Sequence, residues 1–278
     1  MRIRLSKTAL SAVLVIALLL SLASGVSATE PPVLETLAPT EAATEPPETI
    51  PEEAQPSGYT VDTQSPVYRT CAQMAETMQA RQILVYDTNT DTILYSKSVS
   101  GGKLFPASIT KLFSTYVALQ YLDPETVITA GNELDLVHEG SSLAFIAEGG
   151  QYRVKQLVEG MMLPSGNDAA RVLAAAVGRA IKADPNLPDI DAMAAFVAEM
   201  NVQAAAFGMT DSHFVTPDGW HDSNHYTTMA DLLTLAQLCL SDPLILEVVK
   251  TPQYAATFSG RTVYWKNSNM HLKEDSPF

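Results

Sequence analysis

The pattern of hydrophobic and polar positions divides the chain into three parts. An almost unbroken apolar run covers residues 9–22, and a polar, proline-rich stretch covers residues 29–66. From residue 67 onward, apolar side chains recur at the spacings of strands and helices. This succession predicts a leader over residues 1–28, a spacer over 29–66 and a folded domain over 67–278 that is long enough for a hydrophobic core.

Strand and helix spacings follow one another in the folded part. Residues 82–86 and 92–95 are β-branched or aromatic runs on either side of a turn-rich segment, which predicts a β-hairpin. Apolar residues at helical spacing cover residues 108–122, and further helices are predicted at 154–163, 168–181, 191–207 and 229–240. A hairpin followed by many helices indicates an α+β domain, in which we expect only two strands.

The leader has the three parts of a secretory signal. Basic residues Arg2, Arg4 and Lys7 precede the apolar run, and small residues at 26–28 suit signal peptidase. An uncleaved membrane anchor is the alternative, because the run approaches spanning length if residues 24–26 are included. Both interpretations place the rest of the chain outside the cytoplasm, on the extracellular, cell-wall or periplasmic side, with membrane contact only through this segment if it is not cleaved.

The spacer accounts for much of the acidity of the chain. Residues 29–66 contain eight prolines and eight acidic residues but no lysine or arginine, which predicts a stiff, solvated linker. The formal net charge of the whole chain is −14, which argues against nucleic acid as a partner. The two cysteines, Cys71 and Cys239, lie far apart in the sequence, and we interpret them as buried thiols rather than as a disulfide.

A serine and a lysine stand one helical turn apart at the start of the helix predicted at 108–122. Residues at i and i+3 share one helical face, about 5–6 Å apart, so the Lys111 amine can draw the proton from the Ser108 hydroxyl. The amine must be neutral for this, which burial and a second cation can bring about. The alternative is a capping serine followed by a solvated lysine. A second such string, Ser100 to Lys103, contains two glycines that disfavour a helix.

A second candidate element lies between the helices predicted at 154–163 and 168–181. The loop there reads Pro164-Ser165-Gly166-Asn167-Asp168. Ser165 can relay a proton to a leaving group, and Asn167 can hold a substrate carbonyl in the same cavity. The alternative is an ordinary turn and helix cap, because Ser, Gly, Asn and Asp are the usual residues of both.

Three other classes of protein are compatible with parts of the sequence. A Ser-His-Asp hydrolase would normally contain Gly-x-Ser-x-Gly, and the nearest string, residues 140–144, differs at its last position. A zinc peptidase could use Asp218, His221, Asp222 and His225 as ligands. These residues lie in a predicted loop that contains glycine and asparagine, whereas the histidines of such peptidases typically lie on a helix. A non-enzymatic surface protein on the proline-rich spacer is the third alternative.

Taken in order, the strings resemble the serine-type D-alanyl-D-alanine carboxypeptidases, the low-molecular-weight penicillin-binding proteins. The likeness extends from about residue 74 to the C-terminus and includes the hairpin, the serine and lysine of the helix start, and the Ser165 loop. Two more strings follow in the same order, Phe207-Gly208-Met209-Thr210-Asp211-Ser212-His213-Phe214 and Thr216-Pro217-Asp218-Gly219-Trp220. The resemblance implies the DD-peptidase and β-lactamase-like transpeptidase fold, with an antiparallel sheet packed on helices and an all-helical subdomain.

The same resemblance implies a role for each candidate residue. Ser108 is expected to be the acylated nucleophile, Lys111 its general base, and Ser165 with Asn167 the second catalytic element, with no cofactor or metal. The Ser108 backbone amide and one more amide on a strand would form the oxyanion hole. The implied substrate is a peptidoglycan stem peptide ending in D-Ala-D-Ala, and β-lactams are expected to acylate the same serine in a complete protein. A serine β-lactamase of the same fold is the runner-up, and it would need a deacylating carboxylate.

One motif of the family is missing from the chain. Members carry Lys-Thr-Gly on a strand of the cleft, where the motif grips the terminal carboxylate of the substrate. The nearest string, Lys250-Thr251-Pro252, has proline where close backbone approach is needed. We therefore expect a product truncated at Phe278, without the C-terminal strands of the sheet and with little or no turnover. Tyr226-Thr227-Thr228, where relatives usually have Ser-Thr-Ala, is a departure with only a packing consequence expected.

Overall fold

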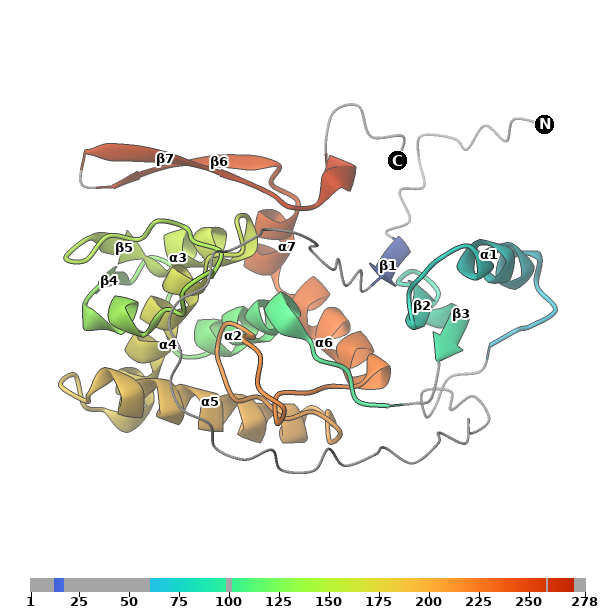
Figure 1. Ribbon diagram of the computed structural model, residues 1–278, viewed down its shortest axis with the longest axis horizontal. Helices are drawn as coiled ribbons and strands as arrows, with labels where there is room; N and C mark the ends of the chain where they lie inside the picture. Colours follow the sequence, from blue (N-terminus) through green and yellow to red (C-terminus); the bar gives the residue numbers. More distant parts are fainter. Residues whose placement is uncertain (1–12, 18–60, 99–101, 259, 273–278) are drawn as a thin grey trace, which may run out of the picture. The chain divides into compact units, whose positions relative to one another are not determined.

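The structure is a computed structural model that describes residues 13–17, 61–98, 102–258 and 260–272. Its contacts divide the chain into two units, Met1–Gly102 and Lys103–Phe278. Figure 1 labels the helices and strands of both units in chain order. Most of the predicted leader and spacer lies outside the described residues, so the boundaries at residues 28 and 66 stay predictions.

The first unit contains an antiparallel sheet with the strand order β1-β2-β3. Strands β2 (Gln82–Asp87) and β3 (Thr92–Ser98) form the predicted hairpin, which is thereby confirmed. Strand β1 (Val13–Ala17) pairs with the other edge of β2. Because β1 lies inside the apolar run of the predicted signal, cleavage of that signal would remove it.

Helix α1 (Pro66–Glu76) also belongs to the first unit and is not among the predicted helices. It begins where the predicted spacer ends. The Ser65 hydroxyl accepts a hydrogen bond from the Tyr68 amide at 3.0 Å, and Pro66 takes the first helical position. Only Ala75 of this helix is fully buried, which explains why the apolar pattern does not reveal it. The Tyr68 ring packs against Tyr95 of β3 with ring centroids 5.2 Å apart.

The described part of the second unit contains six α-helices. They are α2 (Thr110–Leu119), α3 (Val154–Met162), α4 (Asn167–Lys182), α5 (Asp189–Ala206), α6 (Met229–Ser241) and α7 (Pro243–Val249). The first five confirm the predicted helices, although the first of them starts as a 3-10 turn, η1 (Ala107–Ile109). Helix α7 escapes prediction because Asp242-Pro243 resembles a helix end. Instead, the Asp242 carboxylate caps a new helix by accepting hydrogen bonds from two of its amides.

Helix α2 lies at the centre of the second unit. It contacts α3, α4, α5, α6 and α7, and Figure 1 shows it surrounded by other helices. Seven of its side chains are buried, including the polar Thr110, Lys111 and Ser114. A helix enclosed on so many sides keeps the residues at its N-terminus in fixed positions.

The described part of the second unit also contains two short hairpins, so the expectation of only two strands is wrong. Strand β4 (Val127–Thr129) pairs with β5 (Gln151–Arg153), and β6 (Gln253–Phe258) pairs with β7 (Arg261–Lys266). Strands β4 and β5 have three residues each, too few to show an alternating pattern. In β6 the residues that are fully buried are Ala256 and Phe258, and alanine has a low strand propensity.

The β6–β7 hairpin packs on its neighbours through aromatic side chains. Trp265 is 1 % exposed, and its Nε1 donates a hydrogen bond to the Ala144 carbonyl at 2.9 Å. Phe258 meets Tyr152 of β5 edge to face, with ring centroids 4.8 Å apart. These contacts connect the hairpin to the loop at residues 137–150, which carries part of the candidate site.

Both cysteines are free thiols, as interpreted from the sequence, but only Cys239 is buried. Cys239 is buried in α6, where its Sγ donates to the Leu112 carbonyl at 3.7 Å, and burial raises its pKa to about 12. Cys71 of α1 is half-buried.

Candidate active site

Ser108 and Lys111 lie on consecutive turns at the start of the central helix. Ser108 is exposed in the η1 turn, whereas Lys111 is only 1 % exposed in the first turn of α2. The Lys111 Nζ donates a hydrogen bond to Ser108 Oγ at 3.1 Å. The hydroxyl is therefore accessible to a ligand, while the amine behind it is shielded from water.

The Lys111 amine has two further hydrogen-bond acceptors. It donates to Ser165 Oγ at 3.4 Å and to the backbone carbonyl of Asp218 at 2.9 Å. Burial lowers the pKa of Lys111 to about 8, and the carboxylates of Asp218 and Asp168 partly oppose that shift. The second cation considered from the sequence is not among these causes. Desolvation alone lowers the pKa of Lys111 far enough for a fraction of the amine to be neutral near pH 7.

Ser165 reaches the amine from the turn between α3 and α4. Its backbone is in the left-handed region, with φ 62°, and the next residue, Gly166, has no room for a side chain. A β-carbon on Gly166 would stand 2.7 Å from both the Ala144 amide nitrogen and an Asp168 carboxylate oxygen. The tight turn therefore needs glycine at this position, and it directs the Ser165 hydroxyl toward Lys111.

Asn167 follows as the first residue of α4 and is 6 % exposed. Its Nδ2 donates a hydrogen bond to Ser141 Oγ at 3.1 Å, and its backbone amide donates to the Ser142 carbonyl at 2.8 Å. The structure thus places the Ser108, Lys111 and Ser165 side chains in direct contact, with Asn167 two residues from Ser165 and held by the loop at 137–150.

Ser141 is a residue of the site that the sequence considerations did not assign. It stands in the string at 140–144, which we compared only with the Gly-x-Ser-x-Gly motif of another enzyme class. Its contact with Asn167 joins residues 26 positions apart, so no local pattern reveals it.

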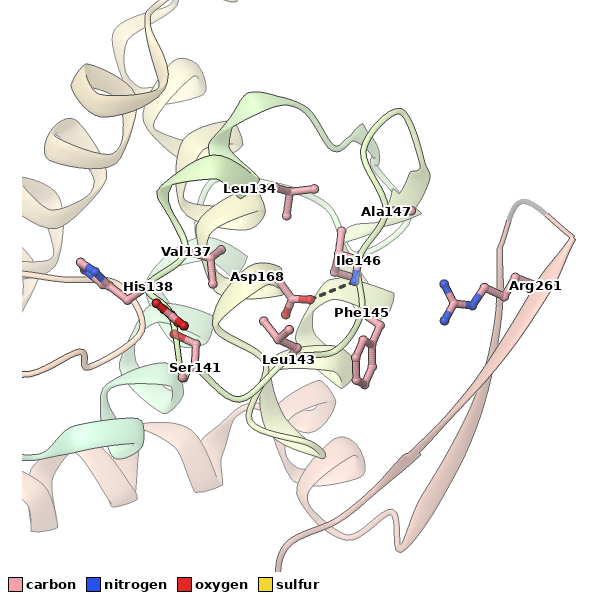
Figure 2. Close-up of a pocket in the computed structure, with 12 residues that line it drawn as sticks. Leu134, Val137, His138, Ser141, Leu143, Phe145, Ile146, Ala147, Asp168 and Arg261 are labelled. Carbon is pink, nitrogen blue, oxygen red and sulfur yellow. Dashed lines mark hydrogen bonds between the residues drawn. The ribbon is translucent and has the colours of Figure 1, made fainter. Parts of the chain in front are cut away.

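Asp168 anchors the same loop. Its Oδ1 accepts hydrogen bonds from the amides of Ala144 and Ala169, at 2.8 and 2.9 Å. Its Oδ2 accepts one from the amide of Ile146 at 2.9 Å, which is the dashed line in Figure 2. The side chain is 3 % exposed, and these three amides compensate its buried charge.

A pocket of about 600 Å³ lies between the loop at 137–150 and the β6–β7 hairpin. Its lining includes Ser141, the hydrogen-bond partner of Asn167, but none of the four candidate catalytic side chains. Figure 2 shows Arg261 extending from β7 on the side of the pocket opposite His138. Phe145 is 56 % exposed at the pocket, with its backbone in the left-handed region at φ 61°. The apolar lining residues are Leu134, Val137, Leu143, Phe145, Ile146 and Ala147, and the polar ones include His138, Glu139, Ser141 and Arg261.

The loop at residues 216–225 closes the other side of the serine and lysine pair. Gly219 has φ +79°, and a β-carbon there would stand 1.8 Å from the Ala107 carbonyl oxygen. His225 is 2 % exposed and lies 2.9 Å from Thr110 Oγ1 through its Nε2. Burial lowers the pKa of His225 to about 4. The ring is therefore neutral at pH 7.

The arrangement of His225 bears on the zinc alternative. Its Nδ1 accepts hydrogen bonds from the amides of Val215 and Thr216, so both ring nitrogens have protein partners. His221 instead packs its ring against Phe105, with centroids 4.8 Å apart. In the part of the chain that the structure describes, no group of three or more His, Cys, Asp or Glu side chains could hold a metal ion.

Two further strings were considered in the sequence. Lys250 ends helix α7, and Thr251 Oγ1 donates to the Glu247 carbonyl, so Lys250-Thr251-Pro252 is not on a strand. The alternative serine, Ser100, lies outside the described residues.

The site as a whole defines a chemical class. An exposed hydroxyl held by a buried amine, with a second hydroxyl on the far side of that amine, can carry out acyl transfer through a serine ester. The amine can accept the proton of the first hydroxyl, and the second hydroxyl can pass a proton onward.

The chain belongs to the D-alanyl-D-alanine carboxypeptidase family, whose sequence model matches residues 69–277. A D-alanyl-D-alanine carboxypeptidase of Streptomyces sp. (strain K15) is 31 % identical over 193 residues, which cover 66 % of this chain and 64 % of that protein. The D-alanyl-D-alanine carboxypeptidase DacA of Escherichia coli (strain K12) is 29 % identical over 208 residues, which cover 69 % and 48 %. The chain thus spans between about half and two thirds of the length of these relatives.

Solved structures show the same relationship. A variant of the Streptomyces K15 DD-transpeptidase matches with a TM-score of 0.64 and 29 % identity, over 72 % of this chain and 78 % of that one. The crystal structure of the K15 DD-transpeptidase itself matches with a TM-score of 0.59 and 29 % identity, over 68 % and 73 %. The α+β transpeptidase fold expected from the sequence is confirmed.

Proposed function

We propose that the protein is a serine-type D-Ala-D-Ala carboxypeptidase that removes the terminal D-alanine from peptidoglycan stem peptides. The observation that carries this proposal is the Lys111 amine, buried 3.1 Å from an exposed serine hydroxyl, with its pKa lowered to about 8. Membership of the carboxypeptidase family supports the choice of substrate. The site residues in this proposal are Ser108, Lys111, Ser165 and Asn167.

In the first half of the reaction, Ser108 Oγ attacks the carbonyl carbon of the penultimate D-alanine while Lys111 Nζ takes the hydroxyl proton. The proton then passes through Ser165 Oγ, 3.4 Å from the amine, to the nitrogen of the leaving D-alanine. The C–N bond breaks, free D-alanine leaves, and the rest of the peptide stays on Ser108 as an ester. The Ser108 backbone N–H would stabilise the oxyanion.

In the second half, water attacks the ester carbonyl while Lys111 accepts a proton from it, and Ser108 recovers that proton as the ester bond breaks. Asn167 would hold the substrate carbonyl throughout. Its Nδ2 already donates one N–H to Ser141 and has a second to offer, so the amide is oriented before the substrate arrives.

The pocket lined by Ser141, the hydrogen-bond partner of Asn167, is a suitable place for the acyl part of the peptide. Its walls are mainly aliphatic and aromatic, and Arg261 adds a positive charge on the far side. Such a lining suits an extended peptide chain that carries a carboxylate. The exposed Phe145 ring would then be covered by the bound peptide.

The state of the nearby carboxylates favours the carboxypeptidase over the β-lactamase. A β-lactamase needs a carboxylate that can activate the deacylating water. The two carboxylates that act on Lys111 are both engaged, Asp168 with three backbone amides and Asp218 with Arg171 and the Trp220 amide. We therefore expect a slow release of β-lactam adducts.

An exported location is also part of the proposal. The substrate is a cell-wall peptide, and the N-terminal pattern of basic, apolar and small residues supports secretion. Among the described helices, none alone has the length and apolar character to cross a membrane, and only α6 and α7 together, bent by 99°, meet that criterion.

Benzylpenicillin followed by intact-mass and peptide-mass analysis tests the proposal. We expect one adduct, located on Ser108, in the full-length protein and none in its Ser108→Ala variant. A persistent adduct over hours supports the carboxypeptidase, whereas turnover within milliseconds would support the β-lactamase. Release of D-alanine from diacetyl-Lys-D-Ala-D-Ala by the full-length protein would complete the case. Absence of both adduct and D-alanine from the full-length protein would favour the non-enzymatic alternative.

A further inference from the structure

A buried ion pair stands directly behind the Lys111 amine. The Asp218 Oδ2 accepts a hydrogen bond from Arg171 Nε at 2.9 Å, and the arginine and aspartate side chains are 8 % and 0 % exposed. The backbone carbonyl of the same aspartate accepts the hydrogen bond from Lys111 Nζ, also at 2.9 Å. Asp218 therefore joins the arginine of α4 to the lysine of α2.

The loop around Asp218 fits closely against α2. Ser114 of α2 donates a hydrogen bond to the Pro217 carbonyl at 2.6 Å, and Gly219 approaches Ala107 too closely for any side chain. The Asp218 Oδ1 accepts a hydrogen bond from the Trp220 amide at 2.9 Å. In this setting, the Arg171 guanidinium and the Trp220 amide hold one carboxylate oxygen of Asp218 each.

The pair also affects the charge of the amine. Burial favours the neutral form of Lys111, and the carboxylates of Asp168 and Asp218 favour the charged form. Three backbone amides compensate Asp168, whereas Asp218 has a full countercharge in Arg171. Without the guanidinium, the Asp218 carboxylate would favour the protonated form of Lys111 more strongly than it does in the pair.

We propose that Arg171 is a positioning residue of this site, which acts on Lys111 through Asp218. It orients the aspartate so that the backbone carbonyl receives the amine, and it offsets part of the negative charge of Asp218, which favours the protonated amine. The inference depends on the proposed function only in treating Lys111 as the general base. The pairing joins residues 47 positions apart.

Direct titration of Lys111 tests this role without any need for catalysis. The chain is labelled with ¹³C-lysine, and the Lys111 signal among the nine lysines is assigned from the spectrum of Lys111→Arg. Arg171→Met is expected to raise the pKa of Lys111 by about one unit, because Asp218 is left uncompensated. Asp218→Asn is expected to lower it, because the guanidinium is then left without its counterion. The double variant is expected to return to the wild-type value.

Shifts of opposite sign that cancel in the double variant cannot result from general damage to the fold. Arg171→Lys keeps a cation at this position and is expected to leave the pKa near that of the wild type. Arg179→Met is the matched control, since it removes another paired arginine from α4, and it should leave Lys111 unaffected. If Arg171→Met does not fold, the Lys111 pKa of Asp218→Asn is compared with that of the double variant, which also differs from it only by the presence of Arg171. Equal Lys111 pKa values in these proteins would overturn the inference.

The pH profile of Ser108 acylation by benzylpenicillin separates this inference from the proposed function. The acylation rate should rise with pH as Lys111 loses its proton, and Arg171→Met should move that rise to higher pH by the shift seen in the titration. Titration shifts without any Ser108 adduct would refute the proposed function and leave the inference standing. If Ser108 is acylated but the pH profile of acylation is the same in Arg171→Met as in the wild type, the inference is refuted.

Discussion

At the scale of single residues, the chemistry depends on an amine that has lost most of its water. Lys111→Arg keeps the positive charge but cannot supply a neutral base, so Ser108 acylation by benzylpenicillin should slow by about 10²–10⁴-fold. Quenched samples analysed by mass spectrometry give the rate. Lys155→Arg, which changes a lysine paired with Glu247 at the surface, is the control and should acylate normally. Acylation of Lys111→Arg at the wild-type rate would contradict the general-base role.

Ser141 should matter through Asn167 and not by itself. Ser141→Ala removes the acceptor of the Asn167 side-chain N–H, and a lost hydrogen bond of this kind corresponds to about a fivefold slower acylation. Ser142→Ala is the matched control, because Asn167 contacts only the backbone carbonyl of Ser142. Equal rates for the two variants would show that this contact does not orient Asn167.

Gly219 is expected to be essential for the fold near Ser108. Gly219→Ala places a β-carbon 1.8 Å from the Ala107 carbonyl oxygen at a positive φ, so its unfolding free energy should fall by about 3 kcal/mol or more. Gly208→Ala has the same backbone strain, at φ +81°, but an open space around it, and should cost about 1 kcal/mol. Urea unfolding of both variants separates the steric clash from the backbone strain.

The sequence reveals those residues of the site that stand in short strings, and misses those that act across the fold. Ser108 and Lys111 share a helical turn, and Ser165 and Asn167 share a loop, so spacing alone makes them candidates. Arg171 contacts Asp218 across 47 positions, and no spacing rule connects them. The one local sign is an arginine within an alanine-rich helix that is buried along most of its length.

At the scale of elements, helix α3 and strand β6 meet around a buried carboxyl group. Glu159 of α3 is 6 % exposed, one of its oxygens has no hydrogen-bond partner, and its neighbours are Lys155 on α3, Glu247 on α7 and Tyr254 on β6. Burial raises the pKa of Glu159 from 4.5 to about 7. The folded chain therefore holds a proton there that the unfolded chain releases.

The sign of the pH dependence follows from that difference. Because the folded state binds more protons between about pH 4.5 and 7, stability from Glu159 falls as pH rises through this window. Glu159→Gln should raise the melting temperature by about 5 °C at pH 8 and have little effect at pH 4. Glu125→Gln, at an exposed ion pair with Arg153, should show no such dependence. Equal melting shifts at both pH values would contradict the raised pKa.

Helices and strands can be predicted from the sequence when they are long enough for their buried residues to form a periodic apolar pattern. Helix α5 has eighteen residues, which is enough for a clear pattern, and its predicted and observed limits agree within two residues. Strand β4 has three residues and none of them is fully buried, so nothing in the pattern marks it. The short helix α7 begins with Pro243 directly after α6, and a proline at the first helical position resembles a proline that ends a helix.

At the scale of the whole molecule, the order of the strings was more informative than any one of them. A serine and a lysine three residues apart occur by chance in many chains. The order in which they, the Ser165 loop and the string at residues 216–220 follow one another implied the α+β transpeptidase fold, which solved relatives confirm. The net charge of −14 comes in large part from the spacer. It argues against nucleic acid as a partner but gives no information about the fold.

The two tryptophans of the chain lie in very different surroundings. Trp265 is a buried residue of β7. Trp220 is half-buried in the loop behind Lys111, and its ring stacks on His138 with ring centroids 4.6 Å apart. Trp265→Phe would leave Trp220 as the one tryptophan of the chain, and its fluorescence emission should change when a ligand binds next to Ser108 and Lys111. The molecule thus contains its own optical probe of binding, and a second indole whose emission follows unfolding.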